Sequence, residues 1–123
     1  MLIVYISATG KVDCFISKLG HNNTLKIVTG NEEVTEEFIL VTGTVGFGEV
    51  PRNIKSFLGN TTNASFLKAV VGSGNKNWGK LYCKAAHIVA EKFNVPLLMT
   101  FESAGTTHDV ENFLNVYNDF VTK

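Results

Sequence analysis

The chain has 123 residues, which suffices for one domain with a substantial core and is too short for two. Lys and Arg together number 11, as do Asp and Glu, so the formal net charge at pH 7 is zero. This balance gives no reason to expect nucleic acid or an anionic membrane as a partner, and we expect a single domain over residues 1–123.

From the N-terminus onward, continuous apolar runs alternate with segments of helical periodicity. Four runs show no alternation of apolar and polar residues, so both faces of each strand should be covered, as in a parallel sheet between helix layers. A weaker run, Leu25–Val28, alternates in part and suits an edge strand. The continuous runs are Leu2–Ile6, Phe38–Val41, Phe66–Val71 and Leu97–Phe101.

Apolar residues at helical intervals predict four helices among these strands. Gly20 should end the first helix and Gly59 the second, in which Pro51 takes the favoured first-turn position. Asp109 or a neighbour should cap the last helix. The predicted helices cover residues 12–19, 50–58, 81–93 and 110–121.

The polar, acidic span from Thr29 to Glu37 is predicted to be a connection with no helix of its own, or at most one turn. Five strands with helices on both faces then remain. Right-handed crossovers make a doubly wound α/β sheet the default topology for such a chain.

Two cysteines and the absence of a long apolar segment bear on the compartment. Cys14 and Cys83 each fall in a predicted helix without a C-x-x-C motif, so we interpret both as reduced thiols. No segment has the length of a transmembrane helix, and the first strand begins at Leu2, so we expect neither a membrane anchor nor a signal peptide. A cytoplasmic protein is the expectation.

The stretch Ser7-Ala8-Thr9-Gly10-Lys11-Val12 lies between the first apolar run and the first predicted helix. Backbone N–H groups at a helix start lack intrahelical partners, and the helix dipole adds partial positive charge there. The two hydroxyls and the flexible Gly10 complete a loop that suits a phosphate group. The alternative is that Ser7 and Thr9 simply cap the helix.

Two glycine-rich loops follow the third and fourth predicted strands, at residues 42–49 and 72–79. In a doubly wound sheet, ligands bind beyond the carboxyl ends of the strands, where these loops lie. Phe47 and Trp78 could stack on the two sides of a planar ring, although Trp78 could equally pack on its own helix start. Asn75 and Asn77 could bond ring heteroatoms or serve only as turn residues. A phosphate and a flat heterocycle together describe a mononucleotide cofactor.

Other motifs do not fit. Pro51 stands where a dinucleotide fingerprint needs its third glycine, and Gly10-Lys11 lacks the remainder of a P-loop. Gly20 occupies the position at which a low-molecular-weight phosphatase loop beginning at Cys14 would need arginine. The three histidines, at positions 21, 87 and 108, have no metal-ligand spacing and are interpreted as surface or loop residues.

Four motifs occur in order along nearly the whole chain: the S-x-T-G loop Ser7–Gly10, the run Gly46–Pro51, the run Ser73–Gly79, and Phe101-Glu102 with Gly105-Thr106. Their order and spacing resemble the NrdI family, the flavodoxin-like flavoproteins that accompany class Ib ribonucleotide reductase. The resemblance implies a flavodoxin-like three-layer sandwich whose five-stranded parallel sheet has the order 2-1-3-4-5.

The resemblance also implies a cofactor, a function and partners. The cofactor would be FMN, reduced by an electron-donating reductase. The reduced flavin would react with dioxygen and supply superoxide or a peroxide-level oxidant to the reductase's small subunit, assembling its dimanganese-tyrosyl radical cofactor. The flavin would carry the chemistry, and no protein side chain would act as acid or base.

Carried over position by position, the resemblance implies a phosphate site at Ser7–Val12 and a ring site formed by the two glycine-rich loops. A glycine peptide near Gly46–Gly48, beside Phe47, would turn toward the flavin N5 as the redox state changes. No metal ligand is implied. The expected cofactor-binding residues are Ser7, Ala8, Thr9, Gly10, Lys11, Val12, Thr42, Thr44, Gly46, Phe47, Gly48, Ser73, Gly74, Asn75, Asn77, Trp78 and Gly79.

The chain departs from the family pattern at Lys11, Gly43 and Lys80. Lys11 is expected to point to solvent, and Gly43 could leave the flavin edge more open. Lys80 joins Lys76 and Lys84 in a strip of helical spacing, which is either a solvated helix face or a docking surface for an acidic partner.

Two other functions stay open. A short electron-transfer flavodoxin serving a reductase would share the fold, although such carriers are usually longer and acidic around the flavin. A flavin-free interaction domain that keeps the fold without its cofactor is the second alternative.

Overall fold

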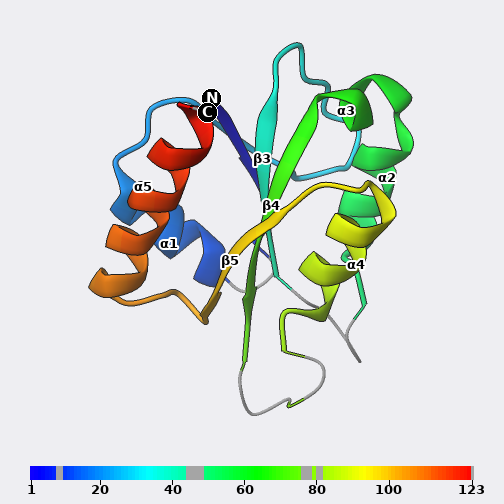
Figure 1. Ribbon diagram of the computed structural model, residues 1–123. Helices are drawn as coiled ribbons and strands as arrows, with labels where there is room; N and C mark the ends of the chain where they lie inside the picture. Colours follow the sequence, from blue (N-terminus) through cyan, green and yellow to red (C-terminus); the bar gives the residue numbers. More distant parts are fainter. Residues whose placement is uncertain (8–9, 44–48, 76–78, 80–81, 123) are drawn as a thin grey trace.

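The structure, a computed structural model, describes residues 1–7, 10–43, 49–75, 79 and 82–122. In chain order its elements are β1 (Leu2–Tyr5), α1 (Lys11–Leu19), β2 (Thr24–Lys26), β3 (Phe38–Thr42), α2 (Arg52–Gly59), α3 (Thr61–Phe66), β4 (Leu67–Gly74), α4 (Lys84–Lys92), β5 (Leu97–Glu102) and α5 (Thr107–Val121). The strands form one parallel sheet of order β2-β1-β3-β4-β5, and helices cover both faces (Figure 1). This architecture confirms the doubly wound, flavodoxin-like fold expected from the sequence.

Each face of the sheet has its own apolar core, because successive residues of a strand point to opposite sides. Ile3 and Ile39 pack with α1 and α5, whereas Val4 and Leu40 pack with α2 and α4. Figure 1 shows the same division, with α1 and α5 on one side of the sheet and α2, α3 and α4 on the other. Burial on both faces explains why the strands appear in the sequence as continuous apolar runs.

Aromatic stacking joins α1, β5 and α5. The rings of Phe15 and Phe101 stack with centroids 3.9 Å apart, and Phe113 meets Phe15 edge-on at 5.6 Å. Gly105, just beyond β5, adopts a φ of +73°, and a Cβ built there would lie 2.7 Å from the Phe15 ring. A residue other than glycine would therefore push the end of β5 away from α1.

Helix α4 lies so close to β4 that Gly72 has no room for a side chain. A Cβ built at Gly72 lies 2.6 Å from Cβ of Ala86 and 3.2 Å from Cβ of Cys83, and one at Gly74 lies 2.8 Å from the Cys83 nitrogen. Cys83 is buried with a φ of 53°, so α4 begins only at Lys84. The prediction of a helix from residue 81 that includes Cys83 was therefore wrong at its start.

A short helix, α3, precedes β4 and was not predicted. The Asn60 side chain caps it by accepting hydrogen bonds from the N–H groups of Thr62 at 2.9 Å and Asn63 at 3.3 Å. Six residues are too few to display an apolar period, so the capping residue Asn60 is the one local signal of this helix. Phe66 consequently ends this helix, and the fourth strand begins at Leu67 rather than at Phe66.

The buried amide of Asn63 holds the acidic connection between β2 and β3 against this helix layer. Its Oδ1 accepts a hydrogen bond from Val34 N at 3.0 Å, and its Nδ2 donates to Glu32 O at 2.8 Å and Phe57 O at 3.0 Å. The span from residue 29 to 37 contains no helix, as predicted.

Helix α5 begins with a capping box. Thr106 Oγ1 accepts a hydrogen bond from Asp109 N at 3.1 Å, and Asp109 Oδ2 accepts one from Thr106 N at 2.8 Å. Asp109 therefore takes part in the cap, but the N-cap residue is Thr106, and α5 begins at Thr107 rather than at the predicted residue 110. None of the helices in the described ranges combines the length and apolar content that a membrane span requires.

Two glycines, one tightly packed and one open, give a test of the α4–β4 contact. Gly72→Ala should lower the free energy of unfolding by about 1–3 kcal/mol, because Ala86 and Cys83 would have to move. Gly59→Ala is the matched control: it lies at the end of α2 with no atom within 4 Å of a Cβ, and should raise stability by up to about 1 kcal/mol. Urea unfolding measures both, and equal effects at the two sites would contradict the tight packing.

Candidate functional site

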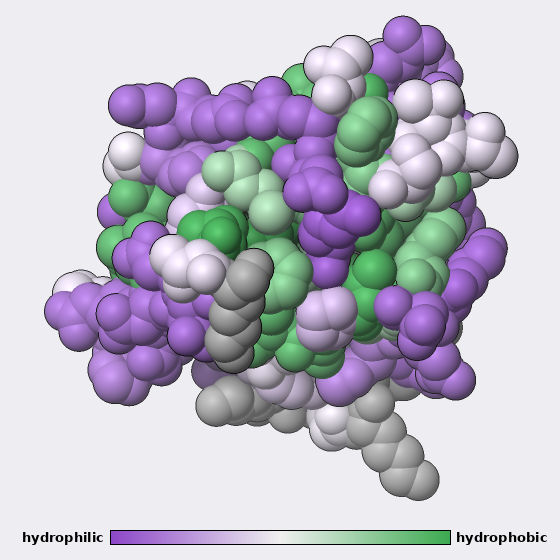
Figure 2. Space-filling model, turned by 45° about the horizontal axis from the view of Figure 1, so that its top comes forward, coloured by the Kyte–Doolittle hydropathy of each residue, from purple (hydrophilic) through white to green (hydrophobic). Residues whose placement is uncertain are grey.

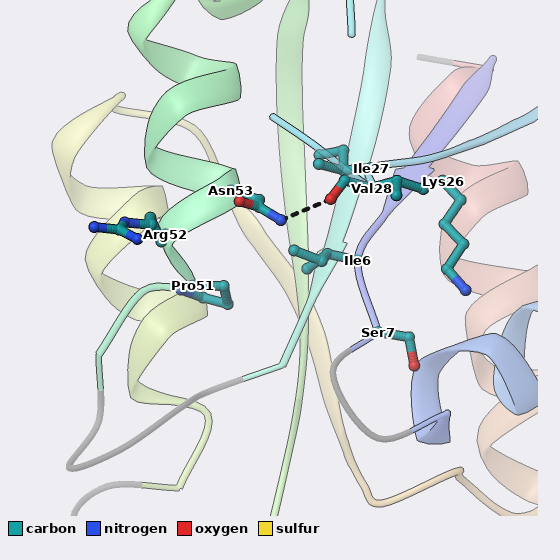
Figure 3. A pocket seen from close by; sticks show the side chains of 8 residues that line it. All are labelled: Ile6, Ser7, Lys26, Ile27, Val28, Pro51, Arg52 and Asn53. Atoms are coloured by element: carbon teal, nitrogen blue, oxygen red, sulfur yellow. Dashed lines mark hydrogen bonds between the residues drawn. The ribbon is translucent and has the colours of Figure 1, made fainter. Parts of the chain in front are cut away.

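The crevice at the carboxyl edge of the sheet lies where the winding direction changes. Strand β1 pairs with β2 on one side and β3 on the other, and the chain leaves β1 toward α1 but leaves β3 toward α2 on the opposite face. Such switch points are where doubly wound sheets bind ligands. A cavity of about 440 Å³ opens there (Figure 3), lined by Ile6, Ser7, Lys26, Ile27, Val28, Pro51, Arg52 and Asn53.

The start of α1 forms one wall of the site and offers backbone donors. Gly10 is its N-cap residue, with a φ of 84° and no atom within 4 Å of the place where a Cβ would stand. Ser7 Oγ accepts a hydrogen bond from Asp13 N at 3.3 Å. The N–H groups of Lys11 and Val12 lie in the first turn of α1, where the helix itself offers them no acceptor. The open space, the helix dipole and these donors fit a phosphate group.

A charge pair lies beside these donors. Lys26 Nζ donates to Asp13 Oδ2 at 2.8 Å, and this hydrogen bond raises the pKa of Lys26. Burial raises the pKa of the neighbouring Tyr5, and the Asp13 carboxylate raises it further, so its phenol stays protonated at neutral pH. Because Lys26 neutralises Asp13, the first turn of α1 does not confront an anion with a free carboxylate.

The opposite wall is formed by the turn after β2 and the start of α2. Asn53 Nδ2 donates to Val28 O at 2.8 Å and ties the two segments together (Figure 3). Pro51 is buried, while Arg52 is exposed and extends away from Ser7 and Lys26. Val28 is 66% exposed, because the chain has already left the sheet after Lys26. The predicted edge strand was therefore too long at its carboxyl end.

Glu32 shapes this turn. Its carboxylate accepts hydrogen bonds from the N–H groups of Val28 at 2.8 Å, Thr29 at 3.0 Å and Gly30 at 2.8 Å. Burial alone would raise the pKa of Glu32, but these hydrogen bonds outweigh it and lower the pKa from 4.5 to about 2. The ionised carboxylate thus fixes the loop that lines the crevice.

The predicted site residues differ in burial: some lie inside strands, and others are exposed at the carboxyl edge of the sheet. Thr42 and Ser73 lie inside β3 and β4 and are buried, and their hydroxyls donate to Gly43 O at 2.9 Å and Ser103 O at 2.7 Å. Val12 is also buried, so it can offer a ligand only its backbone. Gly10, Lys11, Asn75 and Gly79 are exposed at the same edge of the sheet, and Gly74 packs against Cys83.

The predicted ring site lies mostly outside the described residues. Two predicted residues of the phosphate loop, Ala8 and Thr9, also lie outside the described residues, as do Lys76 and Lys80 of the lysine strip. The predicted ring-site residues outside the described ranges are Thr44, Gly46, Phe47, Gly48, Asn77 and Trp78. The aromatic bracket and the docking strip therefore stay predictions. In the part of the chain that is described, no group of three His, Cys, Asp or Glu side chains could hold a metal ion.

Sequence reasoning did not identify Lys26, Asn53 and Glu32 as parts of the site. Lys26 is an ordinary polar position of an edge strand, and only its pairing with Asp13 connects it to the anion site. Asn53 acts through the carbonyl of Val28, 25 residues earlier in the chain, and Glu32 acts through the backbone of the turn just before it. The one available signal was the position of Glu32 a few residues after a strand, where a carboxylate can bond the backbone of a preceding turn.

Comparisons with known proteins agree with this geometry. The family model described as "NrdI Flavodoxin like" matches residues 3–115. A short-chain flavodoxin associated with a non-canonical PDU bacterial microcompartment superposes with a TM-score of 0.68 at 15% identity, covering 98% of this chain and 95% of that one. A WrbA-like flavodoxin from Agrobacterium tumefaciens gives a TM-score of 0.60 at 15% identity, covering 90% and 87%. At these identities the structural likeness establishes the fold.

The hydrogen bonds of Glu32 predict a pH dependence. Since its pKa is lowered on folding, its contribution to stability is fully present above pH 4.5 and is lost as the pH falls toward 2. Glu32→Gln should lower the free energy of unfolding at pH 7 by about 1–3 kcal/mol. The difference from the unsubstituted protein should shrink on acidification through this range. Glu33→Gln, at the next and exposed position, is the control for loss of one charge. A pH-independent difference in urea unfolding would contradict this role.

Proposed function

This chain belongs to the NrdI flavodoxin-like family, and from that premise we propose that its flavin is FMN and that the reduced protein activates a ribonucleotide reductase. The family match over residues 3–115 is the observation that carries the proposal. The partner would be the class Ib small subunit, an electron-donating reductase would supply electrons, and the cytoplasm would be the compartment.

The cofactor supplies the redox chemistry: bound and reduced, FMN would pass electrons to dioxygen and provide superoxide or a peroxide-level oxidant for the dimanganese-tyrosyl radical site. The residues of this chain would bind and orient it. The Ser7 hydroxyl and the first-turn N–H groups of α1 would hold the phosphate, and the loops after β3 and β4 would enclose the ring.

Backbone donors suit this role because they are fixed by the fold. The N–H groups of Lys11 and Val12 are held in the first turn of α1, whose remaining turns pack through Phe15 and Ile16 into the core. They lose no side-chain entropy on binding, in contrast to a long cationic side chain. The Lys26–Asp13 pair supports phosphate binding by removing the nearest negative charge.

Electron transfer by a short flavodoxin is the alternative function on the same fold. Carriers of that kind are usually acidic around the flavin, whereas Lys26 and Arg52 line this crevice and Glu32 is committed to backbone hydrogen bonds. This arrangement favours the activator.

The decisive experiment combines the FMN-loaded protein, chemically reduced, with dioxygen and the manganese-loaded class Ib small subunit. We expect the tyrosyl radical to appear in the electron paramagnetic resonance spectrum, and to be absent when the flavoprotein is omitted. No radical, together with rapid reduction of cytochrome c under anaerobic conditions, would favour the carrier. A colourless protein that takes up no added FMN would contradict both functions.

The charge pair predicts opposite effects of two substitutions on phosphate binding. Lys26→Gln should weaken FMN binding about two- to fivefold, because the Asp13 carboxylate would then repel the phosphate. Asp13→Asn should strengthen it by a similar factor. Riboflavin, which lacks the phosphate, is the matched control ligand, and its affinity should change in neither variant. Titration by flavin fluorescence measures all four affinities, and parallel changes for both ligands would contradict a phosphate at this position.

A further inference from the structure

The helices on the two faces of the sheet carry opposite net charge, although the chain as a whole is neutral. Among the described elements, α2, α3 and α4 hold four cationic side chains and one carboxylate. Helices α1 and α5 hold two lysines and four carboxylates. The acidic connection also lies against this layer, through Asn63, so the layer as a whole is not cationic. The outer surfaces of α2 and α4 form a locally cationic face, and such a face attracts acidic groups.

A groove between α2 and α4 interrupts this cationic face. It encloses about 200 Å³, and Val50, Ile54, Leu58 and Val89 lie among the residues that line it. Ile88, at its edge, is 37% exposed, one of three large apolar side chains that are exposed among the described residues. The groove is smaller than an ordinary small-molecule site, but it matches one large apolar side chain.

Two lysines flank the groove, one from each helix. Lys55 belongs to α2 and Lys92 to α4, and neither forms an ion pair with any residue in the described ranges. Lys92 Nζ lies 5.7 Å from the centre of the Phe93 ring, which also lines the groove. The lining residues include no acid. The acidic connection packs on another side of α2, where Gly30 approaches Asn53 and Ser56.

We propose that the α2–α4 groove is a docking site for an acidic segment of a partner protein that inserts one large apolar side chain between Lys55 and Lys92. The apolar side chain supplies the buried anchor, and flanking carboxylates pair with the two lysines and guide the approach. The groove lies on the opposite face of the sheet from α1.

Charge selects this occupant over two others. In a symmetric dimer of this chain through the same face, the lysines of one copy would approach those of the other, and like charges would oppose association. An anionic bilayer would match the charge, but a concave groove for a single side chain offers little apolar surface to a membrane. The acidic segment satisfies both the charge and the shape.

The test uses ¹⁵N-labelled full-length protein and short acidic peptides with one central Leu, Phe or Trp. We expect saturable chemical-shift changes at Ile54, Leu58 and Val89, and none when serine replaces the central residue. Lys55→Glu and Lys92→Glu should each weaken binding on the order of tenfold. Lys18→Glu, the same charge change on α1, is the matched control and should leave the affinity unchanged.

Three results would overturn the proposal. The first is that none of the peptides saturates at millimolar concentration while the amide spectrum shows a folded protein. The second is that binding maps elsewhere: the shift changes lie on α1 and α5, and Lys18→Glu weakens binding as much as the groove variants do. The third is that the protein sediments with anionic phospholipid vesicles and that Lys55→Glu abolishes this sedimentation, which would assign the face to a membrane. FMN binding by the groove variants, measured separately, should remain normal.

Discussion

The pairing of β1 with β3 is the constraint on which the rest of the structure depends. Its register, from Leu2 opposite Phe38 to Tyr5 opposite Val41, ends both strands at the same edge of the sheet. The chain then leaves β1 toward one face and β3 toward the other, so a crevice must open between the two loops. A slip of this register by one residue would turn Ile3 and Val4 toward the wrong cores and separate the loops.

The strands could be predicted because their burial on both faces leaves continuous apolar runs, but their ends could not. Thr42 and Ser73 look like loop residues, yet each extends a strand because its hydroxyl finds a carbonyl acceptor inside the protein. Val28 looks like a strand residue, yet it is exposed because the Glu32 carboxylate captures its N–H group. Side-chain hydrogen bonds to backbone groups, two of them local and one reaching 30 residues along the chain, accompany these boundaries, and apolar periodicity does not reveal them.

In the candidate site, too, local features could be predicted from the sequence and tertiary contacts could not. The start of α1, where we propose a phosphate site, could be recognised locally, since an apolar run, a small flexible loop and a helical period follow one another within a dozen residues. The charge environment could not, because Lys26 reaches Asp13 only after β2 has paired with β1. Sequence reasoning thus proposed the donors for a phosphate, while the tertiary structure shows that Lys26 pairs with the Asp13 carboxylate beside them.

These contacts separate the part of the fold that forms the candidate site from the part that is exposed on the helices. At the carboxyl edge, the described part of the site relies on backbone groups and on small or buried side chains, which the packing of α1 through Phe15 holds in place. The outer surfaces of the helices do not hold these elements in place, because the buried faces of the helices already complete the two cores. The exposed charges of the helices can therefore differ between the two layers. Lys55 and Lys92 lie beside an apolar groove, and packing of the fold does not require their charges. Surface charge without a structural task, set around a concave apolar surface, is what recognition of another protein requires.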